Sequence, residues 1–169
     1  WAVKKEILHM GGIARSMLAD VRAAFTNNDP SMIEEVARKE RAVNEINRAI
    51  SAYAYEVWQC DLSADLSTVL GSYVNATGDV ERIGDHATNL IELYEYNLDN
   101  RVEFSAVAWA EFDEMYDLVE RAVRVSMESL DEESVEKAAE VDVLSNLERV
   151  CDHAHNISLV SFDISRLGD

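Results

Sequence analysis

The chain has 169 residues, of which 33 are acidic and 15 are basic, giving a formal net charge of −18. Such a negative field repels phosphate groups, so neither nucleic-acid binding nor docking on an anionic membrane surface is expected. Glycine (6) and proline (1) are scarce, which favours long helices over a turn-rich β fold.

Three further features of the composition limit the class of protein. No apolar run reaches the roughly 20 residues of a membrane-spanning helix. The cysteines, Cys60 and Cys151, lack the spacing of a metal motif, so free thiols in a reducing compartment are expected. Because the chain begins at Trp1 rather than Met, we expect it to be a fragment of a longer protein.

Apolar residues recur at helical spacing from the start of the chain. The spacing predicts a first helix over residues 3–25 and a second over residues 33–57. Between them, Asp29 is placed to cap the second helix, and Pro30 suits its first position.

The same periodicity continues through the rest of the chain. After a turn at residues 61–65, it predicts a third helix over residues 66–98. A fourth helix is predicted over residues 104–130, followed by Asp131 as the next cap. We expect residues 99–101 to separate two halves of the protein.

An eleven-residue motif occurs twice, as VERIGDHATNL at residues 80–90 and as LERVCDHAHNI at residues 147–157. Six of the eleven positions are identical, and nearly all of these are polar. A repeat that only packed a core would retain apolar positions instead. The motif therefore indicates a duplicated helix with a carboxylate-rich face.

The duplication predicts an all-α protein of two tandem, pseudo-repeated, antiparallel three-helix bundles, over residues 1–99 and 100–169. The second bundle is abbreviated: the cap-to-motif interval is 52 positions in the first half and 17 in the second. The difference is about one helix and its turn. Either the middle helix is reduced to a remnant at residues 134–141, or residues are missing just after Val141.

The acidic residues of the motif have the spacing of a cation site. Glu81 and Asp85 lie four positions apart, as do Glu148 and Asp152, so each pair shares one helix face. Their mutual repulsion costs an isolated helix about 0.2–0.5 kcal/mol. Mg, Mn or Ca ions would offset it, and Fe or Zn also accept such ligands. The alternative is an ion-pair and hydrogen-bond network between helices.

The other polar residues of the motif are expected to have structural roles. His86 and His153 each follow the motif aspartate, and adjacent helical positions diverge by about 100°. A buried, hydrogen-bonded imidazole is therefore expected rather than a metal ligand. Asn89 and Asn156 are expected to form hydrogen bonds between helices.

Residues 80–90 resemble the signature helix of the PhoU family, the phosphate-uptake regulators. Residues 5–18 resemble the first helix of PhoU-like domains attached to bacterial sodium/phosphate cotransporters. The resemblance implies two tandem three-helix bundles that carry multinuclear iron or zinc sites on their surface. Carried over by residue, it assigns metal ligands in the first bundle (Glu81, Asp85) and in the second (Glu148, Asp152).

The second helix of the family carries another acidic motif. Here the candidate is Glu40, but Asn44 replaces the usual acid four positions later, which weakens the ligand set. In the second half, the nearest equivalent is Asp142.

The resemblance also implies a function. It predicts a non-enzymatic regulatory domain of phosphate transport and signalling, in the cytoplasm at the inner face of the membrane. Its partner would be a membrane phosphate transporter, on the same polypeptide or another, or a sensor kinase, and a homodimer is allowed. No nucleophile motif or glycine-rich phosphate loop indicates an enzyme.

Two other functions are compatible with the sequence. One is a metal-free acidic helical adaptor that binds a basic partner. The other is a ferritin-like di-metal protein, which needs Glu-x-x-His pairs on two helices, whereas only Glu6 and His9 have that spacing.

Overall fold

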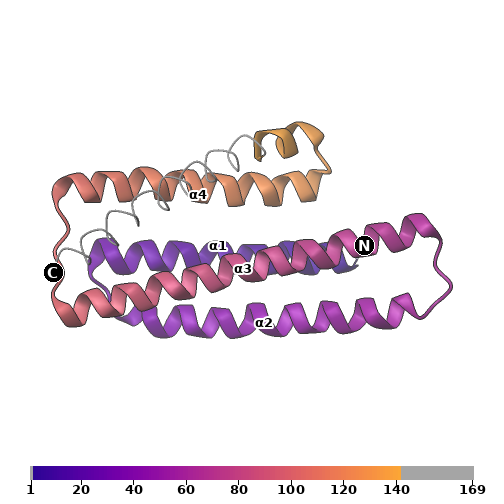
Figure 1. Ribbon diagram of the computed structural model, residues 1–169, viewed down its shortest axis with the longest axis horizontal. Coiled ribbons are helices and arrows are strands. Elements are labelled where there is room, and N and C mark those ends of the chain that lie inside the picture. Colours follow the sequence, from indigo (N-terminus) through magenta and orange to yellow (C-terminus); the bar gives the residue numbers. More distant parts are fainter. Residues whose placement is uncertain (1, 142–169) are drawn as a thin grey trace, which may run out of the picture. The chain divides into compact units, whose positions relative to one another are not determined.

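The computed structural model describes residues 2–141, in which every regular element is an α-helix (Figure 1). These are α1 (Ala2–Asn27), α2 (Ser31–Trp58), α3 (Ala64–Asn100) and α4 (Ala106–Glu132), followed by helical residues 135–141. The predicted all-α class is confirmed, and all four predicted helices are present. None of the described helices combines the length and apolar character needed to cross a membrane.

The chain divides into two compact units, Trp1–Val123 and Arg124–Asp169, so α4 contributes to both. The predicted repeats, over residues 1–99 and 100–169, remain a prediction, because residues 142–169, which include the second copy of the motif, lie outside the described residues. The helical residues 135–141 coincide with the predicted remnant of a middle helix.

Helices α1, α2 and α3 pack on one another around a common apolar core. The core residues recur at helical spacing, and α1 contributes more of them than any other helix. The largest fully buried side chains are Ile7, Met10, Met17, Val21, Val36, Val43 and Thr77. The one polar member, Thr77, donates its hydroxyl hydrogen to the carbonyl of Tyr73 at 2.8 Å, so its burial leaves no hydrogen bond unmade.

Side-chain hydrogen bonds lie at the starts of α2 and α3. The N-cap position of α2 is Pro30, one residue later than predicted. Asp29, just before it, still bonds to the first helical residue: its Oδ1 accepts hydrogen bonds from the backbone N–H of Ser31 at 3.0 Å and from the Ser31 hydroxyl at 2.7 Å. Both hydrogen bonds lower the pKa of Asp29, and the bond from the Ser31 hydroxyl has the larger effect. At the start of α3, Ser63 Oγ accepts from the N–H of Leu66 at 3.3 Å.

The predicted cap at Asp131 is wrong. Asp131 lies inside the last turn of α4, and Ser134 caps the following helical residues by accepting from the N–H of Lys137 at 3.3 Å. Lys137 Nζ also bonds to Glu132 at 2.7 Å and to Glu128 at 3.1 Å. These bonds join the end of α4 to the next helical residues.

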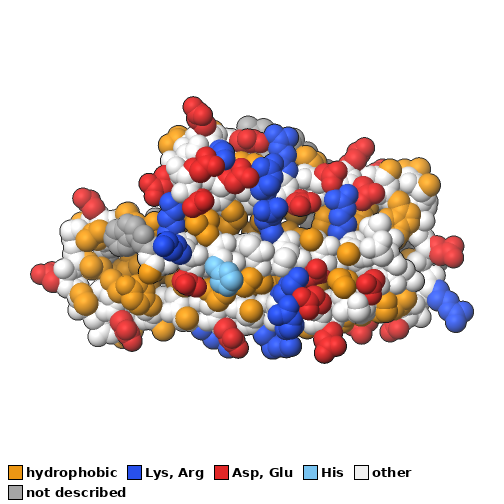
Figure 2. All heavy atoms as spheres, turned by 180° about the vertical axis from the view of Figure 1, so that it is seen from behind, with side chains coloured by type: hydrophobic (Ala, Val, Ile, Leu, Met, Phe, Trp, Pro, Cys, Tyr) orange, Lys and Arg blue, Asp and Glu red, His pale blue; other side chains and the backbone are white. Residues whose placement is uncertain are grey.

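No Cα atom of α4 lies within 8 Å of one in α1. The contacts between these two helices are therefore made by long side chains. Arg22 of α1 forms ion pairs with Asp117 at 2.6 Å and Asp113 at 2.9 Å, and these hydrogen bonds raise its pKa. Tyr116 of α4 donates a buried hydrogen bond to the carbonyl of Leu18 at 2.7 Å. Basic and acidic side chains also alternate over the face seen in Figure 2.

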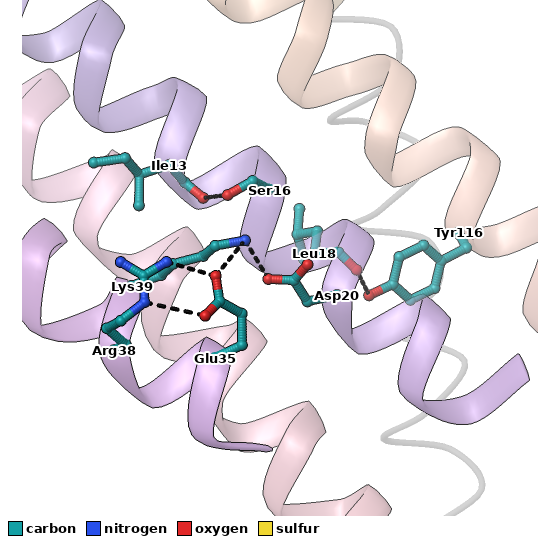
Figure 3. Close-up of polar contacts among 8 residues, drawn as sticks. All are labelled: Ile13, Ser16, Leu18, Asp20, Glu35, Arg38, Lys39 and Tyr116. Carbon is teal, nitrogen blue, oxygen red and sulfur yellow. Dashed lines mark hydrogen bonds and ion pairs between the residues drawn. The ribbon is translucent and has the colours of Figure 1, made fainter. Parts of the chain in front are cut away.

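A second polar link joins α1 to α2. Lys39 of α2 lies between Asp20 of α1 and Glu35 of its own helix, and pairs with both (Figure 3). The side chains of Lys39 and Asp20 are only 16% and 19% exposed, so water screens this pair less than a surface pair. It sets the antiparallel register of α1 and α2.

Tyr116 makes the stability of the protein sensitive to alkali. Burial raises its pKa above the ordinary value, so its contribution is complete below about pH 10 and is lost as the pH rises further. Tyr116→Phe should lower the free energy of unfolding at pH 7 by about 0.5–1.5 kcal/mol, because the bond to Leu18 is lost. Its melting temperature should also fall less between pH 10 and pH 12 than that of the wild type.

Tyr55→Phe is the matched control, because Tyr55 is exposed. It should melt as the wild type does at pH 7. If the melting temperature of Tyr116→Phe falls as steeply between pH 10 and pH 12 as that of the wild type, the result would contradict this role of Tyr116.

Candidate functional site

The motif helix lies close to α2 and α1 at Gly84. A methyl group on Gly84 would lie 3.4 Å from Val43 Cγ1 of α2 and 3.7 Å from Met17 Sδ of α1. Gly84 is buried, as are Val80, Ala87 and Ile91 of the same helix face. Three helices therefore meet where the motif has no side chain.

The acidic residues of α2 and α3 flank this contact in the same way. Glu81 lies three positions before Gly84, and Asp85 lies one position after it. In α2, Glu40 and Asn44 lie at the same offsets from Val43. The two helices run antiparallel, so equal offsets from the contact place both pairs on one side of the α2–α3 layer. We call these four residues the acidic face.

The acidic face points away from α1. Lys39, which pairs with Asp20 of α1, lies on the other side of Val43 from Glu40. Tyr94 of α3 lies on the other side of Gly84 from Glu81, and its hydroxyl is 3.3 Å from Asn28 Oδ1, at the end of α1. The acidic face therefore lies on the outer surface of the bundle.

The described candidate ligands differ in exposure. Glu40 and Glu81 are half-buried, and Asp85 is exposed. Glu40 Oε1 accepts a hydrogen bond from Asn44 Nδ2 at 2.9 Å. Within residues 2–141, Glu40, Glu81 and Asp85 form no salt bridge, and no three His, Cys, Asp or Glu side chains are grouped to hold a metal ion. In the described part of the chain, the acidic face thus lacks the ion-pair network that was the alternative to a cation site.

The candidates of the second repeat, Glu148 and Asp152, lie outside the described residues, as do Asp142, His153 and Asn156. Two predictions for the first copy are wrong. His86 is exposed rather than buried, and Asn89 is exposed without a hydrogen bond to any described residue. Both side chains point away from Gly84, the residue that faces the core.

The acidic face has the chemistry of a hard-cation surface. Carboxylate and amide oxygens are the donors that such ions prefer, and no described Lys or Arg neutralises them. However, two half-buried carboxylates and one exposed carboxylate do not form a complete ligand shell as they stand. Ions that accept few protein ligands and keep bound water fit this face best.

The ion pairs of Arg22 with Asp113 and Asp117 were not predicted from the sequence. A signal was available, because the two aspartates lie four positions apart, as the acids of the motif do. In α4, the cation that compensates such a pair is a guanidinium group.

Comparison with known proteins gives one family. The model of the PhoU domain matches residues 7–94, a segment that covers most of α1, all of α2, most of α3 and the whole acidic face. The match does not extend to α4 or to the second copy of the motif.

Individual relatives carry the same name. The phosphate-specific transport system accessory protein PhoU homolog of Pseudomonas putida is 26% identical, over 92% of this chain and 75% of its own length. The homolog of Clostridium acetobutylicum is 25% identical, over 90% of this chain and 71% of its own length. No solved structure matches the chain significantly.

Gly84 gives a direct test of the three-helix contact. Gly84→Ala should raise the free energy of unfolding by about 0.5–1 kcal/mol, because alanine is the better helix former and its methyl group reaches van der Waals distance of Val43 and Met17. Gly84→Leu should instead lower it by about 1–3 kcal/mol through overpacking. Chemical denaturation measures both changes.

Gly12→Ala is the control, since a methyl group there meets no atom within 4 Å. It should give the helix-propensity gain alone. If Gly84→Ala loses stability while Gly12→Ala gains it, the added methyl group at Gly84 has less room than the 3.4 Å distance to Val43 Cγ1 implies.

Proposed function

Because the chain belongs to the PhoU domain family, we propose that it acts as a regulatory accessory domain of a phosphate transport system. The observation that carries the proposal is the family match over residues 7–94, together with relatives named as accessory proteins of phosphate-specific transport. The domain would restrain phosphate uptake by contacting a membrane transporter or a sensor kinase from the cytoplasmic side.

The acidic face supports a regulatory role for bound cations. Glu81 and Asp85 would bind the ion in the first bundle, with Glu40 as a further ligand across the α2–α3 layer. Glu148 and Asp152 would do the same in the second bundle. A bound cation would reduce the repulsion within each row and would let an anionic group approach a domain whose net charge is −18.

The ferritin-like alternative has little structural support. Its ligands project inward from the helices of a bundle, whereas Glu6 and His9 are both exposed. The metal-free adaptor remains the competing function, and metal analysis distinguishes it.

Phosphate uptake tests the proposed function directly. In the organism that encodes the chain, deleting its gene should increase the initial rate of radiolabelled phosphate uptake under phosphate excess. Reintroducing the wild-type gene should restore the lower rate. An uptake rate that the deletion leaves unchanged would contradict a role in restraining transport.

Metal content tests the ligand assignment separately. Asp85→Asn should lower the metal bound per chain, because the exposed member of the row loses its charge while the helix is preserved. Elemental analysis of protein purified without a histidine tag measures the metal, and circular dichroism checks the helix content.

Asp79→Asn is the matched control, because Asp79 is exposed on the same helix but lies on a different side from Asp85. It should leave the metal content unchanged. Equal metal in both variants would remove Asp85 from the ligand set, and metal-free wild-type protein would favour the adaptor.

A further inference from the structure

The end of the bundle where α2 leads into α3 exposes an unusual amount of apolar surface. Five large apolar side chains there are 39–67% exposed, and we call them the apolar tip: Tyr53, Tyr55, Trp58, Leu66 and Val69. In α2, every large apolar side chain that precedes Tyr53 is buried or half-buried. The exposure is therefore confined to one end of the helix pair.

The register of the helices explains this exposure. Asp20 pairs with Lys39, so the first described residues of α1 lie beside the last turn of α2. Met17 of α1 lies beside Gly84 of α3. Counting back along both helices from this contact, the first turn of α3 extends past the described start of α1. Among the described residues, the first turn of α3 therefore has no part of α1 beside it (Figure 1).

A shallow apolar hollow adjoins the apolar tip. It has a volume of about 240 Å³ and lies between the start of α1 and the second half of α2. Its lining is Ala2, Val3, Glu6, Ile46, Ala49, Ile50 and Tyr53. Tyr53 belongs to both features, so the hollow and the tip form one surface, and Glu6 is the only charged residue of the hollow.

Beside the apolar tip, the charged side chains of α2 and α3 have one sign. Residues 49–81 contain no Lys, Arg or His, whereas Glu56, Asp61 and Asp65 are exposed beside the tip. In Figure 2, hydrophobic side chains gather at the left-hand end, with acidic side chains at the margin. The basic residues next in sequence to the lining of the hollow are Lys4 and Lys5 of α1 and Arg48 of α2.

From these observations we propose that the apolar tip and its hollow are a docking surface for an amphipathic helix of a partner protein, with Lys or Arg flanking its apolar face. Helices of this kind place apolar anchors in hydrophobic depressions, and Tyr and Trp are the residues that most often dominate such interfaces. The acidic rim selects the basic flanks. This proposal does not rest on the proposed function.

The same rim argues against two other occupants. A second copy would bring Glu56, Asp61 and Asp65 against an equally acidic surface, and like charges at an interface are unfavourable. An anionic bilayer would be repelled for the same reason. A cationic protein helix satisfies both the apolar surface and its charge.

The test uses the full chain and a fluorescent peptide of about 18 residues, built from Leu and Lys as an amphipathic helix. Fluorescence anisotropy measures its affinity. Tyr55→Ser with Leu66→Ser should weaken binding by about tenfold or more. Leu93→Ser with Tyr96→Ser is the matched control, since it removes the same side-chain types from exposed positions near the other end of α3, and it should change binding less than twofold.

Two further measurements keep the proposal falsifiable if the tip variant is poorly folded. Glu56→Gln with Asp61→Asn and Asp65→Asn, all at exposed positions, should weaken binding several-fold and reduce its dependence on salt. Amide chemical shifts of the wild-type chain should change on peptide addition mainly within residues 46–69 and the first turn of α1.

Several outcomes would overturn the proposal. Equal weakening by the tip and control variants would mean that the peptide binds by general charge attraction. Self-association that only the tip variant abolishes would assign the surface to a second copy. Binding to phosphatidylcholine vesicles that only the tip variant abolishes would assign it to a membrane.

Discussion

The close approach of three helices at Gly84 is the constraint on which the rest of the structure depends. A glycine there lets α3 lie against Val43 of α2 and Met17 of α1, so the buried stripes of all three helices can meet around one core. The contact also sets the rotation of α2 and α3 about their axes. With that rotation set, Glu81 and Asp85 fall on the outer side of the layer, beside Glu40.

The same geometry separates the packing of the motif helix from its chemistry. Val80, Gly84 and Ala87 face the core, whereas the carboxylates occupy the positions between them. A change in the acids therefore alters surface charge without opening the core. A regulatory surface needs this arrangement, because ions or partners can bind and leave while the bundle remains intact.

Much of the fold could be predicted from the sequence, because apolar spacing and scarce breakers determine helices strongly. The Asp29-Pro30 turn could be identified for the same reason, since both residues have position-specific roles at a helix start. Asp131 could not be distinguished from a cap, because an acid in the last turn of one helix resembles an acid before the next. Ser134 was the better candidate only once the end of α4 was known.

The site was predicted less completely than the fold. Four-residue spacing placed Glu81 and Asp85 on one helix face, but spacing alone does not say which way that face points. The exposure of His86 and Asn89 follows from the rotation set at Gly84, which is a tertiary contact. The role of Arg22 depends in the same way on α4 lying beside α1, which no local pattern encodes.

The way in which α4 is attached has a consequence for the motions of the protein. Ion pairs of Arg22, one hydrogen bond from Tyr116 and an aromatic contact between Phe25 and Phe112 join it to α1. The close backbone approach that α1, α2 and α3 share is absent between α4 and α1. Exposed ion pairs contribute little free energy each. Transient detachment of α4 would therefore precede global unfolding, and its amides would exchange with solvent deuterium before those of the three-helix core.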